Sequence, residues 1–222
     1  QTKADKLWLL VHDNRSTDLS APYLEKIKKQ CKKLGVEVKV AHSNRLNLFQ
    51  TIKSIKDIIK QEENNYIYVN VASGSKIQAI SCMMACMVLK ECKNLQPFYA
   101  EPETYAAFEG KQQSFGLKDT IPLPTYEIQT PKPKLLQALK IVQQAKNQKI
   151  TKKEMAIIAE EQEIITINSE EKNHSQARFA SLDKNIIQPL VDEWNFVKIE
   201  KIGRNRWIKI TQEGINAAEF LI

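Results

Sequence analysis

The chain has 222 residues, 42% of them hydrophobic and 27% charged, and carries a formal net charge of +7. These proportions are typical of soluble globular proteins and exclude a disordered or fibrous chain. No apolar run approaches the roughly 20 residues of a membrane span, and the apolar run after Lys6 has the wrong flanks for a signal peptide. We therefore expect a cytoplasmic protein of two ordinary domains.

The positive charge is spread along the chain. Residues 1–130 hold 18 Lys and Arg against 14 Asp and Glu, and residues 131–222 hold 15 against 12. A basic protein favours partners rich in phosphate, but many basic proteins bind no nucleic acid. The choice of partner therefore depends on local clusters of charge.

The cysteines do not predict a metal site. Cys82 and Cys86 share a helical face, but they lie in an apolar stretch with no His or CxxC pattern nearby. Packing as small hydrophobic side chains is the preferred interpretation, and no disulfide is expected. The sequence predicts no metal and no cofactor.

Residues 1–130 alternate strand and helix patterns. Short apolar runs predict strands, and each is followed by an amphipathic segment that predicts a helix. This alternation favours an α/β, Rossmann-like domain with a mainly parallel sheet. The predicted strands are 6–12, 36–41, 66–71 and 95–100, the predicted helices are 20–34, 47–62 and 75–92, and a hairpin is expected before residue 130.

Prolines at 122, 124, 131 and 133 mark a linker, since proline interrupts both helices and central strands. In residues 131–222 the pattern changes, and Thr151 and Glu154 form a capping box that opens a helix. Three helices, a hairpin and a closing helix predict an α+β winged helix-turn-helix domain. The predicted helices are 134–145, 151–161, 174–194 and 214–220, and the predicted strands are 196–201 and 206–210.

Three polar loops follow predicted strands, where ligands bind in sheets of this kind. The third loop, Asn-Val-Ala-Ser-Gly-Ser-Lys at 70–76, is the most informative. Gly74 permits a positive φ or close approach of a ligand, and the next helix offers free N–H groups to an anion. Ser73 and Ser75 add hydroxyls, and Lys76 adds a charge. The alternative is a tight turn with Ser73 or Ser75 as the N-cap.

The other two loops are His-Asp-Asn at 12–14 and His-Ser-Asn-Arg at 42–45. No glycine lies five residues before Gly74, so the third loop is not a Walker A motif. No Ser-His-Asp order typical of a hydrolase is present. Binding rather than catalysis is therefore predicted.

The hairpin at 197–210 holds five basic residues against one acid. Arg204 and Arg206 lie at its tip, where the wing of a winged helix touches phosphate or the minor groove. The alternative is a solvated hairpin whose charges protect an edge strand from aggregation. The alternation of side chains predicts that Val197, Ile199, Ile208 and Ile210 face inward.

The helix at 174–194 is the candidate recognition helix. Its first residues would enter a major groove, so the predicted contacts beside His174 are Gln176, Arg178 and Lys184. Two acids, Glu170 and Glu171, precede it and would repel phosphate. Winged helices also bind proteins, so the fold alone does not establish DNA binding.

The motif at 70–76, followed by a C-terminal winged helix, resembles the CARF family of CRISPR-associated Rossmann-fold sensors. Within that family the chain looks most like archaeal CARF–winged-helix transcriptional regulators. The resemblance implies a homodimer in which the two copies of the motif line a pocket for a cyclic oligoadenylate or a related nucleotide. It carries over to Ser73, Gly74, Ser75 and Lys76, and more loosely to Asn14 and Ser43.

The chain departs from the family pattern in two ways. The family motif follows a fourth strand, whereas here it follows the third, so we expect a first strand upstream of Gln1 that this chain lacks. Ser73-Gly74 also stands in place of two glycines, which weakens the case for close approach of a phosphate.

The predicted function is a ligand-responsive, DNA-binding transcriptional regulator without enzymatic activity. One alternative is a CARF-like nuclease that cleaves cyclic oligonucleotides, with Ser75 or Lys76 assisting phosphoryl chemistry. The other is a protein-interaction adaptor whose winged helix binds no DNA.

Overall fold

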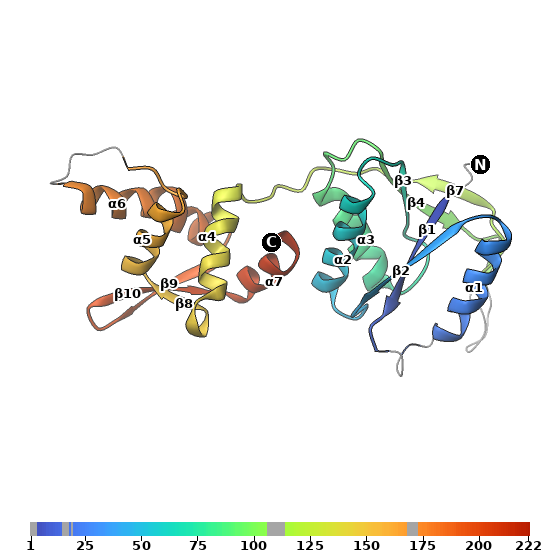
Figure 1. The fold of residues 1–222 in the computed structure, drawn as a ribbon, viewed down its shortest axis with the longest axis horizontal. Helices are drawn as coiled ribbons and strands as arrows, with labels where there is room; N and C mark the ends of the chain where they lie inside the picture. Colours follow the sequence, from blue (N-terminus) through green and yellow to red (C-terminus); the bar gives the residue numbers. More distant parts are fainter. Residues whose placement is uncertain (1–3, 15–17, 19, 106–113, 168–172) are drawn as a thin grey trace. The chain divides into compact units, whose positions relative to one another are not determined.

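The computed structural model describes residues 4–14, 18, 20–105, 114–167 and 173–222. The chain divides into two compact units, Gln1–Gln129 and Thr130–Ile222 (Figure 1). The division falls one residue before the predicted boundary, within the stretch that proline marks as a linker. No helix in the described part of the chain is long and apolar enough to cross a membrane.

The first unit alternates strands and helices along most of its length, as predicted. An irregular region with three short strands follows the last long strand. The elements are β1 (Lys6–His12), α1 (Ala21–Lys33), β2 (Glu37–Ser43), α2 (Leu48–Gln61), β3 (Ile67–Asn70), α3 (Lys76–Val88), β4 (Leu95–Glu101), β5 (Thr104–Tyr105), β6 (Ser114–Phe115) and β7 (Asp119–Pro122).

The long strands pair in parallel, which confirms the predicted α/β class. β1 pairs with β2, and β3 pairs with β4, both in parallel register. β7 adds an antiparallel edge to β4, and β5 and β6 form a separate antiparallel pair. Among the described residues, no ladder joins β1 to β3. The predicted strand upstream of Gln1 stays a prediction.

Helices α2 and α3 pack against each other and tie the two parallel pairs together. The contact is polar as well as apolar, since the buried Ser81 hydroxyl lies 3.4 Å from the Leu48 carbonyl oxygen, which it can reach as a donor. Leu48 begins α2, and Ser81 lies in the first half of α3. The loops that follow β2 and β3 therefore open at the same end of the unit.

The second unit has the predicted order of a winged helix domain. Its helices are α4 (Pro133–Gln144), α5 (Lys152–Glu161), α6 (His174–Leu182) and α7 (Gln212–Leu221), and α6 continues through π-helical turns at Asp183–Ile187 and Pro189–Glu193. Its sheet has the antiparallel order β8 (Lys149–Thr151), β10 (Asn205–Ile210), β9 (Val197–Ile202).

Side chains cap two helix starts of this unit, the first of them as predicted. Thr151 and Glu154 form a reciprocal capping box on α5, and the Thr211 hydroxyl accepts from the Gly214 N–H at the start of α7. The core of this unit takes side chains from its helices and from its sheet. Its fully buried side chains include Leu139, Met155, Leu182, Ile186, Leu190 and Ile208.

One inward prediction on the hairpin is wrong. Ile199 lies opposite Ile208 in the register, so the two side chains share a face of the sheet. Ile208 is 2% exposed, whereas Ile199 is 45% exposed. The reason is position in the sheet: β10 is the central strand, and β9 is an edge strand that leaves the core as it approaches the wing tip. Val197 and Ile210 are buried, as predicted.

Candidate ligand site and DNA interface

The loop between β3 and α3 adopts the conformation that Gly74 makes possible. Gly74 has φ +89°, which an L side chain rarely adopts. The Ser75 hydroxyl accepts from the Gln78 N–H as the N-cap of α3, and the Gln78 side chain accepts from the Ser75 N–H at 2.7 Å. The turn-and-cap interpretation of this loop is therefore correct for Ser75.

The Gln78 side chain covers the glycine. A Cβ built on Gly74 would lie 2.6 Å from Gln78 Oε1. An anion at the start of α3 would therefore compete with the Gln78 amide for the Ser75 N–H. Ser73 and Lys76 are exposed beside it, and no acidic side chain of the described residues pairs with Lys76. The loop can receive an anion once Gln78 moves.

The other two predicted residues of this site lie at the ends of β1 and β2. Asn14 is exposed just beyond β1, and its N–H donates to Asp13 Oδ1 at 2.8 Å. Ser43 is buried and is the register partner of His12. Both residues lie at carboxyl ends of parallel strands, as does the Ser73–Lys76 loop.

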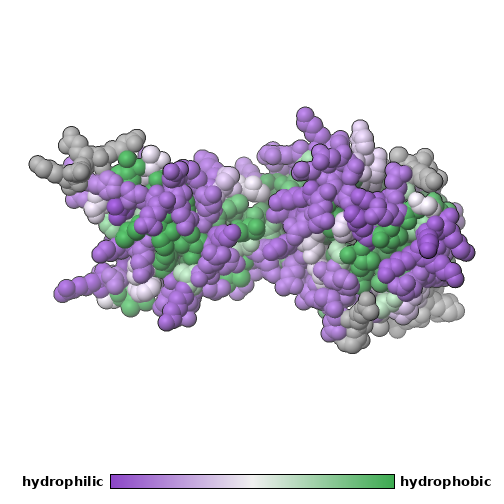
Figure 2. Space-filling model, in the orientation of Figure 1, coloured by the Kyte–Doolittle hydropathy of each residue, from purple (hydrophilic) through white to green (hydrophobic). Residues whose placement is uncertain are grey.

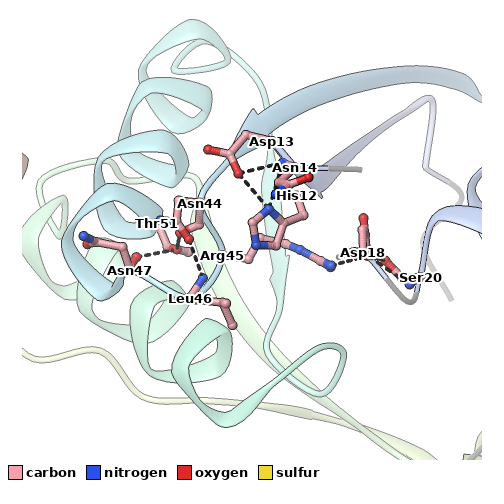
Figure 3. A network of polar contacts seen from close by, with 10 residues as sticks. All are labelled: His12, Asp13, Asn14, Asp18, Ser20, Asn44, Arg45, Leu46, Asn47 and Thr51. Atoms are coloured by element: carbon pink, nitrogen blue, oxygen red, sulfur yellow. Dashed lines mark hydrogen bonds and ion pairs between the residues drawn. The ribbon is translucent and has the colours of Figure 1, made fainter. Parts of the chain in front are cut away.

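A polar network joins the segments that follow β1 and β2 (Figure 3). Arg45 forms a 2.5 Å ion pair with Asp18, whose carboxylate also accepts from the backbone N–H and the hydroxyl of Ser20. His12 Nδ1 lies 2.7 Å from Asp13 Oδ1. Burial raises the pKa of Asp18, but the bonds from Ser20 and the Arg45 charge outweigh it, so the pKa is lowered overall.

The sequence did not single out Asp18 or Arg45. Arg45 stood in a loop already marked as polar, but Asp18 lies 27 residues away from it in the chain. Only the parallel pairing of β1 with β2 brings the two together. No spacing rule connects such a pair.

The wing forms one side of a cleft of about 320 Å³ in the second unit. Figure 2 shows hydrophilic side chains over the hairpin end of this unit. The cleft combines the first turn of α5, one ring from α6 and the tip of the hairpin. Its lining residues are Thr151, Lys152, Lys153, Phe179, Arg204, Asn205 and Arg206.

One of the four cations in the cleft is already paired. Lys152 Nζ lies 2.5 Å from Asp183 Oδ2 and 5.7 Å from the centre of the Phe179 ring. Lys153, Arg204 and Arg206 are exposed and have no ion pair with a described residue. The positive end of α5 points into the same region. The cleft therefore carries an uncompensated positive charge suited to a phosphate.

The candidate recognition helix presents its predicted residues unequally. Gln176 and Lys184 are exposed. Arg178 has a side chain only 25% exposed, and its Nε lies 2.6 Å from Glu160 Oε2. His174 Nε2 lies 2.9 Å from the other oxygen of Glu160. Arg178 would have to leave Glu160 to read a base, and its DNA contact stays a prediction. Glu170 and Glu171 lie outside the described residues.

The same division appears in comparisons with known families. Residues 134–222 match the family model described as DUF6293 C-terminal winged helix domain. The C-terminal unit is a winged helix domain. Residues 1–105 match a second model, described as HFX_2341_N:-like, N-terminal. The two matches confirm the predicted order of domains, an N-terminal domain followed by a C-terminal winged helix. The resemblance of the N-terminal domain to the CARF family stays a prediction.

The individual proteins that resemble this chain share little of its sequence. "Uncharacterized protein MJ1513" of Methanocaldococcus jannaschii is 25% identical over 185 residues, which cover 72% of this chain and 55% of that protein. The solved structure of Can2 from Sulfobacillus thermosulfidooxidans in complex with cyclic tetra-adenylate aligns with 97% of this chain and 56% of its own, at 16% identity and a TM-score of 0.37. This chain thus spans about half the length of each of these two proteins.

Proposed function

We propose that this protein is a cytoplasmic transcription regulator that binds DNA through its winged helix domain and a nucleotide-like anion through its N-terminal domain. The observation that carries the DNA-binding part is the cleft between α5 and the wing. Lys153, Arg204 and Arg206 present positive charge there without an acidic partner among the described residues. Such cations attract the DNA backbone, and their contribution is independent of base sequence.

The two Arg residues of the wing are assigned to phosphate, and exposed Gln176 and Lys184 to the major groove. This division follows the docking of winged helix-turn-helix domains, in which one helix enters the groove and flanking elements hold the backbone. Arg178 can contact a base in the groove only if its ion pair with Glu160 breaks.

The test of the wing is the double substitution Arg204→Ala and Arg206→Ala. We expect weaker binding to every DNA sequence, and a plot of log affinity against log salt that is shallower by about two units, since each phosphate contact contributes about 0.9. Fluorescence anisotropy with a labelled duplex measures both quantities. Lys140→Ala with Lys146→Ala removes the same charge from exposed positions of this domain and serves as the control.

An unchanged affinity and salt slope in the Arg204/Arg206 variant would refute the wing assignment. If the wild-type protein also shows no salt-dependent binding to any duplex, the winged helix is a protein-binding module. The adaptor alternative would then replace the regulator.

The N-terminal domain is proposed to bind its ligand at Ser73–Lys76 as a homodimer. The support is an apolar surface next to the loop: Ile77 is 40% exposed and Ile80 is 52% exposed on α3. A second copy of α3 would cover these side chains and bring the two loops together. A cyclic oligoadenylate is the candidate ligand, because it offers phosphates to both copies.

Ligand binding across such a dimer would shift the relative placement of the two winged helices and so change DNA affinity. No catalytic role is assigned to Ser75, because its hydroxyl is engaged as the N-cap of α3.

A further inference from the structure

We infer that His12, Ser43, Arg45 and Asp18 form a second subsite, which binds a ribose hydroxyl of the ligand. The inference rests on the proposed nucleotide-binding function and names the part of the nucleotide that the Ser73–Lys76 loop does not hold. Its starting point is a group of buried polar atoms that the fold leaves without a hydrogen bond. Within the described residues these are His12 Nε2, Asp18 Oδ2, Ser43 Oγ and Arg45 Nε.

Such atoms are costly. A buried polar atom without a partner costs roughly 1–3 kcal/mol, and native proteins keep few of them. Here four occur together at the ends of β1 and β2, and they account for four of the five such atoms found among the described residues. The remaining one is Arg178 Nε, which forms the ion pair with Glu160. The other four atoms gather at the ligand-binding edge of a parallel sheet, and this concentration points to a bound group.

The four side chains converge on one place. His12 and Ser43 are register partners in adjacent parallel strands. Arg45, two residues beyond Ser43, reaches across to Asp18. Figure 3 shows the Arg45 side chain extending toward Asp18. A single small group could therefore bond to several of these atoms.

The chemistry of the cluster selects that group. His12 Nδ1 accepts a hydrogen bond from the Asn14 N–H at 3.0 Å, and it lies 2.7 Å from Asp13 Oδ1. Because Nδ1 accepts, Nε2 carries the ring proton and is a donor. Arg45 Nε donates, Asp18 Oδ2 accepts, and Ser43 Oγ does both.

The charges of Arg45 and Asp18 cancel within their ion pair. A phosphate at this position would be repelled by the Asp18 carboxylate. A hydroxyl both donates and accepts and carries no charge, so it satisfies the cluster. The Ser81–Leu48 contact places the loops after β2 and β3 at the same end of the unit, so one nucleotide can present a phosphate to Lys76 and a hydroxyl to Ser43.

Calorimetric titration of the full chain tests the subsite with three probes: cyclic tetra-adenylate, its all-2′-deoxy analogue and pyrophosphate. We expect wild-type protein to prefer the ribo ring, and Ser43→Ala to weaken ribo binding by roughly 5- to 20-fold, the value of one hydrogen bond. The same variant should bind the deoxy ring as wild type does. Ser54→Ala is the matched control, since that hydroxyl bonds only to the Gln50 carbonyl of its own helix.

The outcomes separate this inference from the proposed function. Equal binding of ribo and deoxy rings by wild type, or an unchanged ribo affinity in Ser43→Ala, overturns the subsite. If Lys76→Ala weakens pyrophosphate binding in that case, the proposed anion site still stands. If wild-type protein binds no probe, both are overturned. A melting curve of Ser43→Ala shows whether that variant is folded, and His12→Ala removes a second, independent contact, the one made by Nε2.

Discussion

Glu62 connects β1 to the end of α2 through its carboxylate. It accepts from Lys6 Nζ and Trp8 Nε1 at 2.9 Å and from Asn65 Nδ2 at 2.8 Å. The side chain is nearly buried, with 10% of its surface exposed. The bonds from Lys6 and Trp8 lower the pKa of Glu62 to about 2.

This residue makes the N-terminal domain sensitive to acid. Because the pKa of Glu62 is about 2 in the folded protein and ordinarily 4.5, its stabilisation is fully present above pH 4.5 and is lost as the pH falls through 2. Glu62→Gln should lower the free energy of unfolding by roughly 1–2 kcal/mol at neutral pH, through loss of charge-assisted bonds.

Urea unfolding at several pH values measures this effect. The difference between Glu62→Gln and wild type should shrink below pH 4.5, and exposed Glu63→Gln should show no difference at any pH. A constant difference across the pH range would contradict the assigned pKa.

At this scale the sequence predicted the polar loops but not their pairing. It marked residues 12–14 and 42–45, yet the Arg45–Asp18 pair depends on strand register. It also offered Arg178 as a base-reading side chain, because a single sequence cannot show that Glu160 of the preceding helix lies against it. Local residue types were predictable, whereas partners from distant segments were not.

Helix α3 brings together the loop, the cap and the proposed dimer surface. Its N-terminus is set by Ser75 and Gln78, and its first turns expose Ile77 and Ile80. Exposed isoleucines beside a polar loop favour burial against a partner, because each recovers apolar surface from water.

Ile80→Glu tests that surface. We expect the variant to elute as a monomer where the wild-type protein elutes as a dimer, because a charge at the centre of the contact must lose its hydration without gaining a partner. Size-exclusion chromatography with light scattering gives the mass. Leu46→Glu, at a position 71% exposed outside α3, should leave the dimer intact. A wild-type monomer at all concentrations would exclude the interface.

Elements were the most predictable level of this fold. The capping box of Thr151 and Glu154 acts within one turn, so sequence spacing located it. The wing strands were also predicted, but the burial of Ile199 was not. Burial along a strand depends on what covers it, and the alternation of side chains carries no information about an edge.

The whole molecule combines a Rossmann-like domain with a winged helix domain on one chain, and this arrangement was predictable from the change of pattern across the prolines. The coupling that we propose between the domains was not, because it would depend on a ligand and a second copy of the chain. We propose that an anion at Ser73–Lys76 changes the affinity of the protein for DNA at the wing. Such coupling must be reciprocal, so DNA also changes the affinity for the anion.

The most direct test measures the DNA affinity of the full chain with and without saturating cyclic oligoadenylate. Fluorescence anisotropy at one fixed salt concentration, with a duplex from the region upstream of its own gene, gives the Kd. The account predicts a change of at least about 5-fold, lost in Lys76→Ala while the affinity without ligand stays the same. An identical Kd with and without ligand, in a protein that calorimetry shows to bind it, would contradict the account.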